Sequence, residues 1–244
     1  MRIKLTIAYD GTDFRGFAEQ LEVRTVAGEL RPLLEKVLQT PLKLAAAGRT
    51  DAGVHAWGQV VSLDVPDDAE LVAIPRAVNG LLGPEIIIRS VEEVSPDFHA
   101  RFSAKYRRYL YTIVNTENPD PFKARYAWWV QQLLDVKAMQ EAAQYFLGER
   151  DFTSFCRQDS EDASTVRNVT KVQWKVLSDN VLRFDISANA FCWQMVRSIV
   201  GTLADVGLGK LSPAQIPEIL TVKNRNAAGD LAPPNGLCLQ EVMY

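Results

Sequence analysis

An arginine and an aspartate, Arg49 and Asp51, lie two residues apart in the stretch AAAGRTDAGVHAWG, residues 45–58. In an extended segment both side chains leave the same side of the backbone, and a neighbouring guanidinium stabilises a carboxylate anion. Such a carboxylate is ready to act as a nucleophile or a general base. Gly48 and Gly53 permit tight turns and the close approach of a ligand. A turn stabilised by an Arg–Asp salt bridge is the alternative interpretation.

Other reactive groups and cofactor motifs are scarce in this chain. It contains no phosphate-binding loop of the Gly-x-x-x-x-Gly-Lys type, no Gly-x-Gly-x-x-Gly fingerprint after the first strand and no Gly-x-Ser-x-Gly elbow. Two histidines are too few for most metal sites, and no Cys-x-x-Cys pair is present. We therefore expect no metal, no cofactor and no disulfide framework, which leaves a carboxylate as the main reactive group. The histidines are His55 and His99, and the widely separated cysteines are Cys156, Cys192 and Cys238.

Charge is polarised along the chain although its sum is small. The 27 Lys and Arg against 30 Asp and Glu give a formal charge of -3, so no global attraction to a polyanion is expected. Residues 101–125, however, are rich in Lys and Arg and include Tyr106, Tyr109 and Tyr111. Cations for phosphate and ring faces for an unstacked base are what a nucleic-acid groove needs. A solvated edge strand that resists aggregation is the alternative.

The amino terminus MRIKLTIAYDG alternates polar and apolar residues like a strand, and no apolar run approaches the length of a membrane span. We expect a cytoplasmic protein without a membrane anchor.

The hydrophobic periods of the first hundred residues predict the order β-α-β-β-α-β, the split βαβ arrangement. Thr25 is a candidate helix cap, and Pro32 is expected to kink its helix or delay the helix start. The expected strands are 2–9, 41–47, 59–65 and 85–89, and the expected helices are 25–39 and 69–82.

The second half repeats this order less regularly. Its expected strands are 106–114, 171–177, 181–188 and 236–244, with a turn at residues 178–180, and its expected helices are 136–147 and 191–206. Two copies of one pattern predict an α+β fold of two similar ferredoxin-like or RRM-like halves, residues 1–104 and 105–244. These halves are expected to form an extended, mainly antiparallel sheet with helices on one face and a central active-site cleft.

Two further side chains are candidates for a site. Tyr109 lies nearer the basic end of its strand than Tyr111 and Ile113, which have the pattern of core residues. Arg197 lies on a small and polar stripe of the last long helix, one turn before Gly201. A phosphate or a carboxylate is able to approach a helix that a glycine thins in this way, whereas a solvated arginine is the alternative.

Several ordered blocks resemble the TruA family of tRNA pseudouridine synthases. AGRTDAGVHAWGQV is similar to the family's signature, and IAYDGTDFRGF, DFHARFSAKYRRYLY, GERDFTSF, ANAFCWQMVRSIVGTLADVGLG and APPNGLCLQEV are similar to its other blocks. The resemblance covers nearly the whole chain. It implies a cofactor-free and metal-free isomerase that converts uridine to pseudouridine at positions 38, 39 and 40, in the anticodon stem-loop of tRNA, and that is a homodimer.

The resemblance also assigns roles to single residues. It implies that Asp51 is the nucleophile, that Arg49 pairs with it, that Tyr109 stacks on the target base and that Arg197 is a basic residue of the active site. It leaves open whether the carboxylate attacks C6 of the base or C1′ of the ribose. It also leaves open which tRNAs are modified.

The chain departs from the family pattern in two places. Gly16-Phe17-Ala18 stands where Gly-Trp-Gln is usual, which is expected to affect tRNA binding, and Phe191-Cys192-Trp193 replaces a plainer pattern. Two alternatives to the synthase remain: an RNA-binding protein of the same fold without catalysis, and a hydrolase of small substrates with a carboxylate nucleophile.

Overall fold

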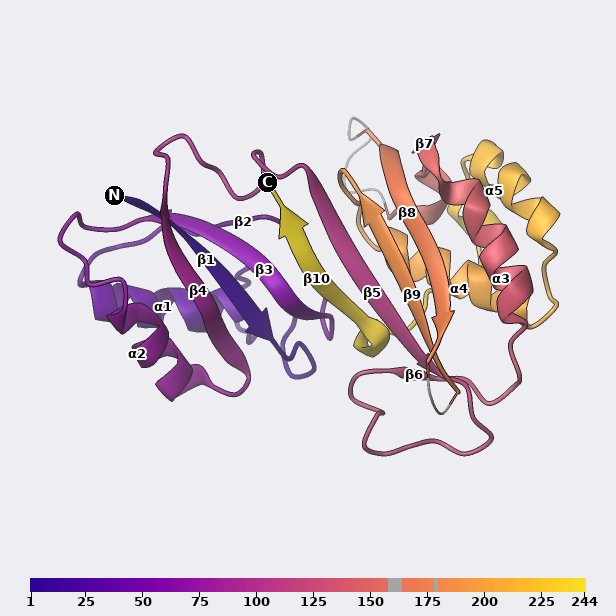
Figure 1. The fold of residues 1–244 in the computed structure, drawn as a ribbon, viewed down its shortest axis with the longest axis horizontal. Helices are drawn as coiled ribbons and strands as arrows, with labels where there is room; N and C mark the ends of the chain where they lie inside the picture. The colour runs from indigo at the N-terminus through magenta and orange to yellow at the C-terminus, as the bar shows by residue number, and fades with distance from the viewer. Residues whose placement is uncertain (158–163, 178–179) are drawn as a thin grey trace. The chain divides into compact units, whose positions relative to one another are not determined.

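The computed structural model describes residues 1–157, 164–177 and 180–244 and divides the chain into two compact units (Figure 1). The first unit comprises residues 1–105 and 238–244, and the second comprises residues 106–237. The change from the first unit to the second at residue 105 lies beside the boundary expected from the sequence. The final strand, however, belongs to the first unit rather than to the second half.

The sheet of the first unit has the split βαβ order. Its central strand β1 pairs antiparallel with β3 on one side and with β4 on the other. The short strand β2 pairs antiparallel with β3, and β10 pairs with β3 in parallel. The strands are β1 (Arg2–Tyr9), β2 (Ala45–Ala46), β3 (His55–Asp64), β4 (Ile86–Val94) and β10 (Leu237–Met243).

β2 and β10 pair with opposite ends of β3. β2 has two residues instead of the expected seven and pairs with Val61 and Ser62. The backbone of His55 and Ala56, at the other end of the same strand, pairs with Cys238 and Leu239. The end of the chain thus pairs with the part of β3 that directly follows the loop of Asp51.

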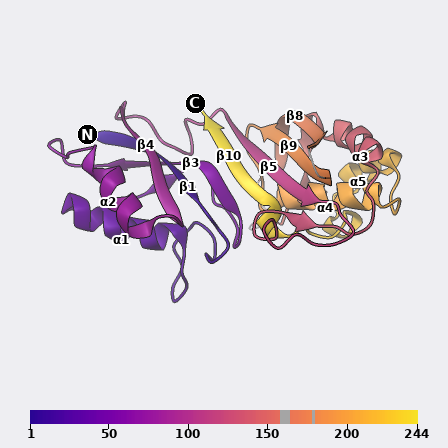
Figure 2. The same ribbon diagram turned by 60° about the horizontal axis from the view of Figure 1, so that its bottom comes forward.

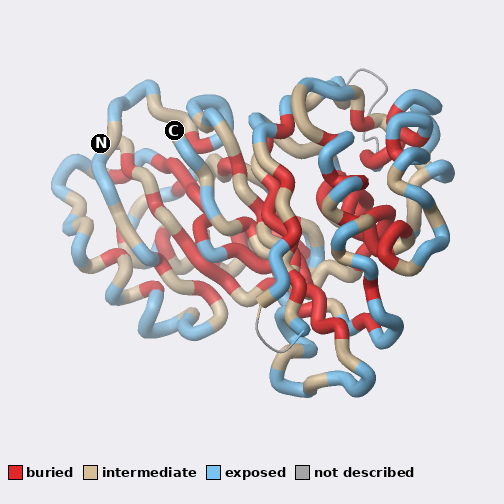
Figure 3. The backbone as a smooth tube through the Cα atoms, turned by 45° about the vertical axis from the view of Figure 1, so that its right-hand side comes forward, coloured by how far each residue is buried: buried red, intermediate tan, exposed pale blue. Residues whose placement is uncertain are grey.

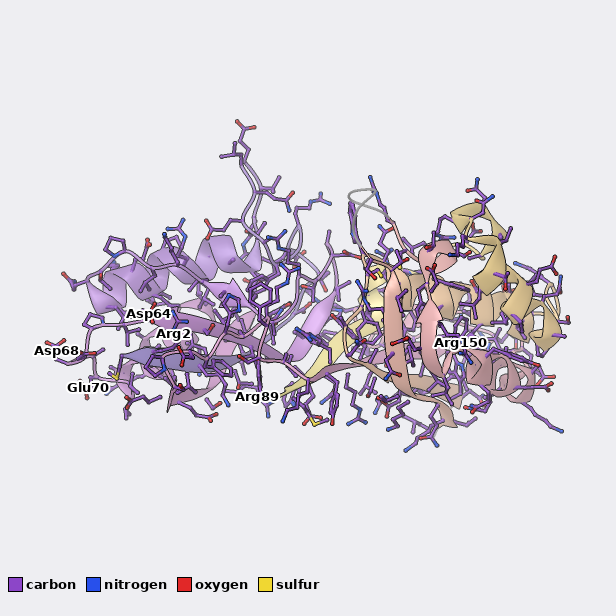
Figure 4. All side chains as sticks on the ribbon, turned by 90° about the horizontal axis from the view of Figure 1, so that it is seen from above. Arg2, Asp64, Asp68, Glu70, Arg89 and Arg150 are labelled. Carbon is purple, nitrogen blue, oxygen red and sulfur yellow. The ribbon has the colours of Figure 1, made fainter. Side chains whose placement is uncertain are left out.

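An ion pair fixes the register of β1 against β3. Arg2 and Asp64 are register partners, and the guanidinium binds the carboxylate through Nε–Oδ1 at 2.8 Å and Nη2–Oδ2 at 2.6 Å (Figure 4). These hydrogen bonds raise the pKa of Arg2 and lower the pKa of Asp64. Because a slip of one residue would move every side chain to the other face, such a bidentate contact at the strand end favours one register.

Two helices lie together on one face of the first sheet (Figure 2). They are α1 (Val26–Leu38) and α2 (Ala73–Leu82). The hydroxyl of Thr25 accepts the Gly28 N–H at 3.2 Å, so the predicted cap is confirmed. Pro32 lies inside α1 without delaying its start. The buried stripe of Val26, Leu30 and Leu34 continues past the proline and holds the helix on the sheet.

The second unit is built on strands in the order β5-β9-β8-β7, all paired antiparallel. α3 packs against α4 and β8. Residues 178 and 179 of the predicted turn at residues 178–180 lie outside the described residues. The elements are β5 (Tyr106–Val114), β6 (Trp128–Trp129), α3 (Val136–Ala143), β7 (Gly148–Asp151), β8 (Val166–Val176), β9 (Val181–Ala188), α4 (Met195–Gly207) and α5 (Ile216–Val222).

The start of α4 is four residues later than predicted, because Gln194 has φ +64° and ψ +4°. A residue in this left-handed region does not continue an α-helix backward. Phe191, Cys192 and Trp193 therefore form a connecting segment and not the first helical turn. The rings of Phe191 and Trp193, which depart from the family pattern, therefore lie in the second unit beside the start of α4.

Buried positions run along the strands of each unit (Figure 3). In the first unit they alternate along β1, where Ile3, Leu5 and Ile7 are fully buried. In the second unit Tyr111 and Ile113 are fully buried on β5, so their prediction as core residues is confirmed. Each unit therefore has its own hydrophobic core.

A close backbone approach in the second unit depends on Gly201 of α4. A Cβ atom at this position would lie 1.7 Å from the carbonyl oxygen of Asp230. The segment around Asp230 therefore runs directly against the helix. The exposed Gly80 of α2 is a contrast, since a Cβ there would meet nothing within 4 Å.

We predict opposite effects of alanine at these two glycines. Gly201→Ala must displace backbone in a packed interior and is expected to lower the free energy of unfolding by about 2 kcal/mol or more. Gly80→Ala improves helix propensity and is expected to raise it by about 0.5–1 kcal/mol. Urea unfolding of both variants measures the difference, and equal free energies for Gly201→Ala and wild type would contradict the close approach.

Candidate active site

Asp51 opens a tight turn just before β3. Its carbonyl oxygen accepts the N–H of Val54 at 3.1 Å, which closes a β-turn over residues 51–54. Gly53 has φ +77°, a conformation that turns of this kind reserve for glycine. The carboxylate is only partly buried. The turn thus presents Asp51 from the backbone just before β3 and leaves its carboxylate partly accessible.

Thr50, directly before Asp51, is held at two points. Its hydroxyl shares a hydrogen bond of 2.7 Å with the hydroxyl of Tyr9 at the end of β1, and both residues are buried. Its carbonyl oxygen accepts the N–H of Phe17 at 3.1 Å. The main chain next to Asp51 is therefore tied to the first strand and to the loop that follows it.

Further hydrogen bonds fix both ends of the loop. Gln59 of β3 is fully buried and donates through Nε2 to the carbonyl oxygen of Gly48 at 2.8 Å. His55, also buried, accepts the Gly11 N–H at Nδ1 at 3.0 Å. Neither residue has a role in the sequence-based prediction of the site. A glutamine among apolar strand residues is the signal for the first contact, since a buried amide needs partners.

Arg49 directly precedes Thr50, and its side chain is exposed. Its expected pairing with the Asp51 carboxylate stays a prediction. The main chain before Asp51 is held by the hydrogen bonds of Gly48 and Thr50.

Tyr109 is on β5 in the second unit and is 9% exposed. The ring of Phe191 packs against it edge-on, with 5.1 Å between the ring centroids. Edge-to-face packing of this kind fixes the orientation of a ring. The aromatic side chain of Tyr109 is consequently held in place from the segment that precedes α4.

Arg197 is in the first turn of α4 and is fixed through its own unit. Its Nε donates to the carbonyl oxygen of Ala232 at 2.7 Å, and the Ala232 N–H donates to the Arg197 carbonyl oxygen at 3.2 Å. The hydroxyl of Tyr111 donates to the neighbouring Pro233 carbonyl at 2.8 Å, while burial raises the pKa of this phenol and the Arg197 charge opposes that rise. Tyr109 and Tyr111, two positions apart, are thus on the same face of β5, and Tyr111 and Arg197 bind the neighbouring residues Pro233 and Ala232.

The space beside Gly201 is filled by the chain itself. The sequence left open that a phosphate or a carboxylate approaches α4 there, but the backbone of Asp230 takes that position. The glycine therefore serves the segment that orients Arg197, through Ala232, and does not open a ligand site.

Two arginines of the basic strand serve the fold. Arg107 is 9% exposed and donates to the Asn189 carbonyl oxygen at 2.8 Å. Arg108 binds the buried carboxylate of Asp185 through two hydrogen bonds of 2.9 and 2.8 Å, and Lys171 binds the same carboxylate at 2.6 Å. Arg108 of β5 and Lys171 of β8 are thus linked through Asp185 of β9, and Arg107 binds the residue that follows β9.

The described residues contain no group of three His, Cys, Asp or Glu side chains able to hold a metal ion. No helix in the described part of the chain is long and apolar enough to cross a membrane.

Comparison with known proteins gives one family. The family model described as tRNA pseudouridine synthase matches residues 5–103 and 142–244, which include Arg49, Asp51 and Arg197 but not Tyr109. A tRNA pseudouridine synthase A of Bacillus licheniformis is 44% identical over an alignment of 250 residues, including gaps, that covers 100% of this chain and 99% of that protein.

Other relatives and one solved structure complete the comparison. Proteins of the same name from Brevibacillus brevis and Bacillus subtilis are 43% and 40% identical, each over 100% of this chain and 99% of the relative. A chain in a Cbf5-Nop10-Gar1 complex is 13% identical, covers 97% of this chain and 48% of its own length, and has a TM-score of 0.40. This score is too low to support any argument.

We predict that Asp185→Asn lowers the free energy of unfolding at neutral pH and that this effect shrinks in acid. Burial opposes ionisation of Asp185, but hydrogen bonds from Arg108 and Lys171 outweigh it and lower its pKa. A lowered pKa stabilises the fold above the unfolded-state value of about 3.9, and this contribution is lost as the pH falls through the folded-state pKa.

Asp185→Asn is therefore expected to cost about 1–2 kcal/mol at pH 7, discounted because both cations are more than one third exposed. The difference from wild type should shrink below about pH 4. Urea unfolding at pH 7, 4 and 3 measures it, with the exposed Glu149→Gln as the control. A difference that stays constant or grows toward pH 3 would contradict this account.

Proposed function

Because this chain belongs to the tRNA pseudouridine synthase family, we propose that Asp51 is the nucleophile with which it isomerises uridine in tRNA. The reaction itself, conversion of uridine to pseudouridine, is that of the family, and the chain is an isomerase that acts on tRNA. Asp51 matches the catalytic aspartate of the family signature.

The isomerisation exchanges one bond for another at the ribose. The N1–C1′ bond breaks, the uracil rotates, and a C5–C1′ bond forms, while C5 loses a proton and N1 gains one. A carboxylate assists this exchange either by adding to C6 of the base or by attacking C1′. In either case the uridine must leave the helical stack, which costs a few kcal/mol and is offset by contacts in the protein.

The observation that carries the proposal is the way in which Asp51 is presented. The turn of residues 51–54 exposes the carboxylate in part, while Thr50 and Gly48 on its amino-terminal side are tied to Tyr9, Phe17 and Gln59. A preorganised charged group loses little free energy on reaching the geometry of the transition state. A nucleophile requires this combination of fixed backbone and accessible side chain.

The resemblance supports roles for three other residues. Tyr109, held edge-on by Phe191, is proposed to stack on the target base. Arg197, oriented by the Ala232 carbonyl, is proposed as a basic residue of the active site. Arg49, two residues before Asp51, is proposed to pair with the catalytic carboxylate and to keep it ionised, as the resemblance implies.

The finer assignments are also proposals. The resemblance supports uridines 38 to 40 of the anticodon stem-loop as the targets, a homodimer as the active form and the cytoplasm as the compartment. Neither alternative, an RNA-binding protein without catalysis or a hydrolase of small substrates, is favoured by any feature of the structure.

We predict that Asp51→Asn abolishes turnover, because an amide of nearly the same size cannot attack the uridine. The assay uses tRNA tritiated at uracil C5, without cofactor and with a chelator, and measures the tritium released to water. Asp68→Asn, an exposed carboxylate of the same unit (Figure 4), is the matched control and should retain wild-type turnover. tRNA binding by Asp51→Asn is expected to stay within a few-fold of wild type.

Two outcomes would reject parts of the proposal. Turnover by Asp51→Asn at the wild-type rate would show that Asp51 is not the nucleophile. Absence of tritium release by the wild-type protein from every tRNA tested would reject the synthase activity itself.

The proposed homodimer has a separate test. Sedimentation equilibrium is expected to give twice the chain mass of 27.3 kDa. A mass of one chain throughout the micromolar range would contradict the dimer.

A further inference from the structure

A basic pocket lies wholly within the second unit. It has a volume of about 410 Å³ and is lined by three cationic side chains, Arg157, Lys223 and Arg225, together with Gln194 and Asn224. No Asp or Glu lines it. An excess of positive charge around an open polar volume attracts an anion.

The two arginines of this basic pocket are already oriented. The Arg157 guanidinium lies 4.3 Å from the ring centroid of Trp193, and the backbone N–H of Arg157 donates to the Trp193 carbonyl oxygen at 3.0 Å. The Arg225 guanidinium donates through Nη1 to the Gly229 carbonyl oxygen at 3.1 Å. A guanidinium has five N–H groups, and stacking on a ring uses none of those of Arg157. The remaining donors are held near the pocket at little entropic cost.

Lys223 enters the pocket from the end of α5. Its Nζ binds Asp151 Oδ2 at 2.8 Å, and its side chain is 61% exposed. The other oxygen of Asp151 accepts from Thr153 and Thr165, and these bonds with Lys223 outweigh burial and lower the pKa of the carboxyl. Asp151 therefore offsets one of the three positive charges, so a net positive charge remains at the pocket.

The start of α4 adds to this field. Gln194, which lines the pocket, immediately precedes the 13-residue helix and gives no side-chain cap to its first turn. Uncapped N–H groups at a helix start favour an anion nearby. The pocket thus combines fixed cations with the positive end of a helix.

We propose that this basic pocket binds a phosphate group of the tRNA backbone and so helps to position the substrate on the second unit. This inference rests on the proposed function for the identity of the RNA. The volume accommodates a phosphate with its ribose, and the exposed Arg157 and Lys223 are accessible to a polymer. Trp193, part of the departure from the family pattern, holds Arg157 in place for this contact.

We predict that Arg157→Gln and Lys223→Gln each weaken tRNA binding and each reduce the slope of log Kd against log salt concentration by about one. A phosphate contact releases counterions when it forms, so its loss lowers the salt dependence. Lys210→Gln is the matched control, because Lys210 is 64% exposed, binds Asp205 and does not line the pocket. Binding is measured by fluorescence anisotropy with full-length tRNA.

The result separates this proposal from the proposed function. Slopes for Arg157→Gln and Lys223→Gln equal to that of Lys210→Gln, with normal tritium release by the wild-type protein, would overturn the pocket alone. Tritium release is the only criterion for the synthase activity, whereas the salt slope is measured by binding and needs no turnover. Thermal unfolding checks that the variants are folded.

A second measurement uses the unmodified protein. Acetylation of lysines with a water-soluble reagent, followed by mass spectrometry, is expected to show several-fold protection of Lys223 by tRNA and no protection of Lys210. Inorganic phosphate at the same phosphate concentration is expected to protect neither residue. Protection of Lys223 by inorganic phosphate but not by tRNA would identify a site for a small anion and overturn the proposal.

Discussion

The hydrogen bonds to Thr50 are the constraint on which the rest of the site depends. The hydroxyl of this residue meets Tyr9, and its carbonyl oxygen meets Phe17, so one residue joins the end of β1, the following loop and the loop of Asp51. Burial strengthens this arrangement, since an unpaired polar group there costs about 1–3 kcal/mol. The position of the main chain beside Asp51 is thereby determined by the sheet.

The main chain beside Asp51 is anchored through backbone groups of its neighbours. A structural ion pair such as Arg108–Asp185 ties up both side chains and buries the acid, as a cross-link between strands requires. The loop of Asp51 is instead fixed through the carbonyl oxygens of Gly48 and Thr50. The same chain thus uses one kind of contact for stability and another for presenting a reactive group.

The sequence predicts strands best where polar and apolar residues alternate regularly, because one face of the strand is buried. The strands at Tyr106–Val114 and Val181–Ala188 are confirmed at both ends for this reason. Local pattern does not determine backbone conformation at single residues, and so the left-handed Gln194 shortens α4 at its start. The pairing of β10 with β3 joins segments nearly the whole chain apart, which no local pattern contains.

Candidate side chains, too, are predicted from local sequence but not where contacts with distant residues decide their roles. Asp51 was found from its residue type and its glycine neighbours, both of which are local. The pairing of Arg49 with Asp51 stays a prediction, because spacing in the sequence does not determine where two side chains meet. The roles of Gln59 and of Lys223 depend on contacts across 11 and 72 residues, with Gly48 and Asp151. The run of positive charge along β5 therefore pointed to arginines that stabilise the fold. The basic pocket was not predicted, because three segments of the second unit that are distant in the sequence form it.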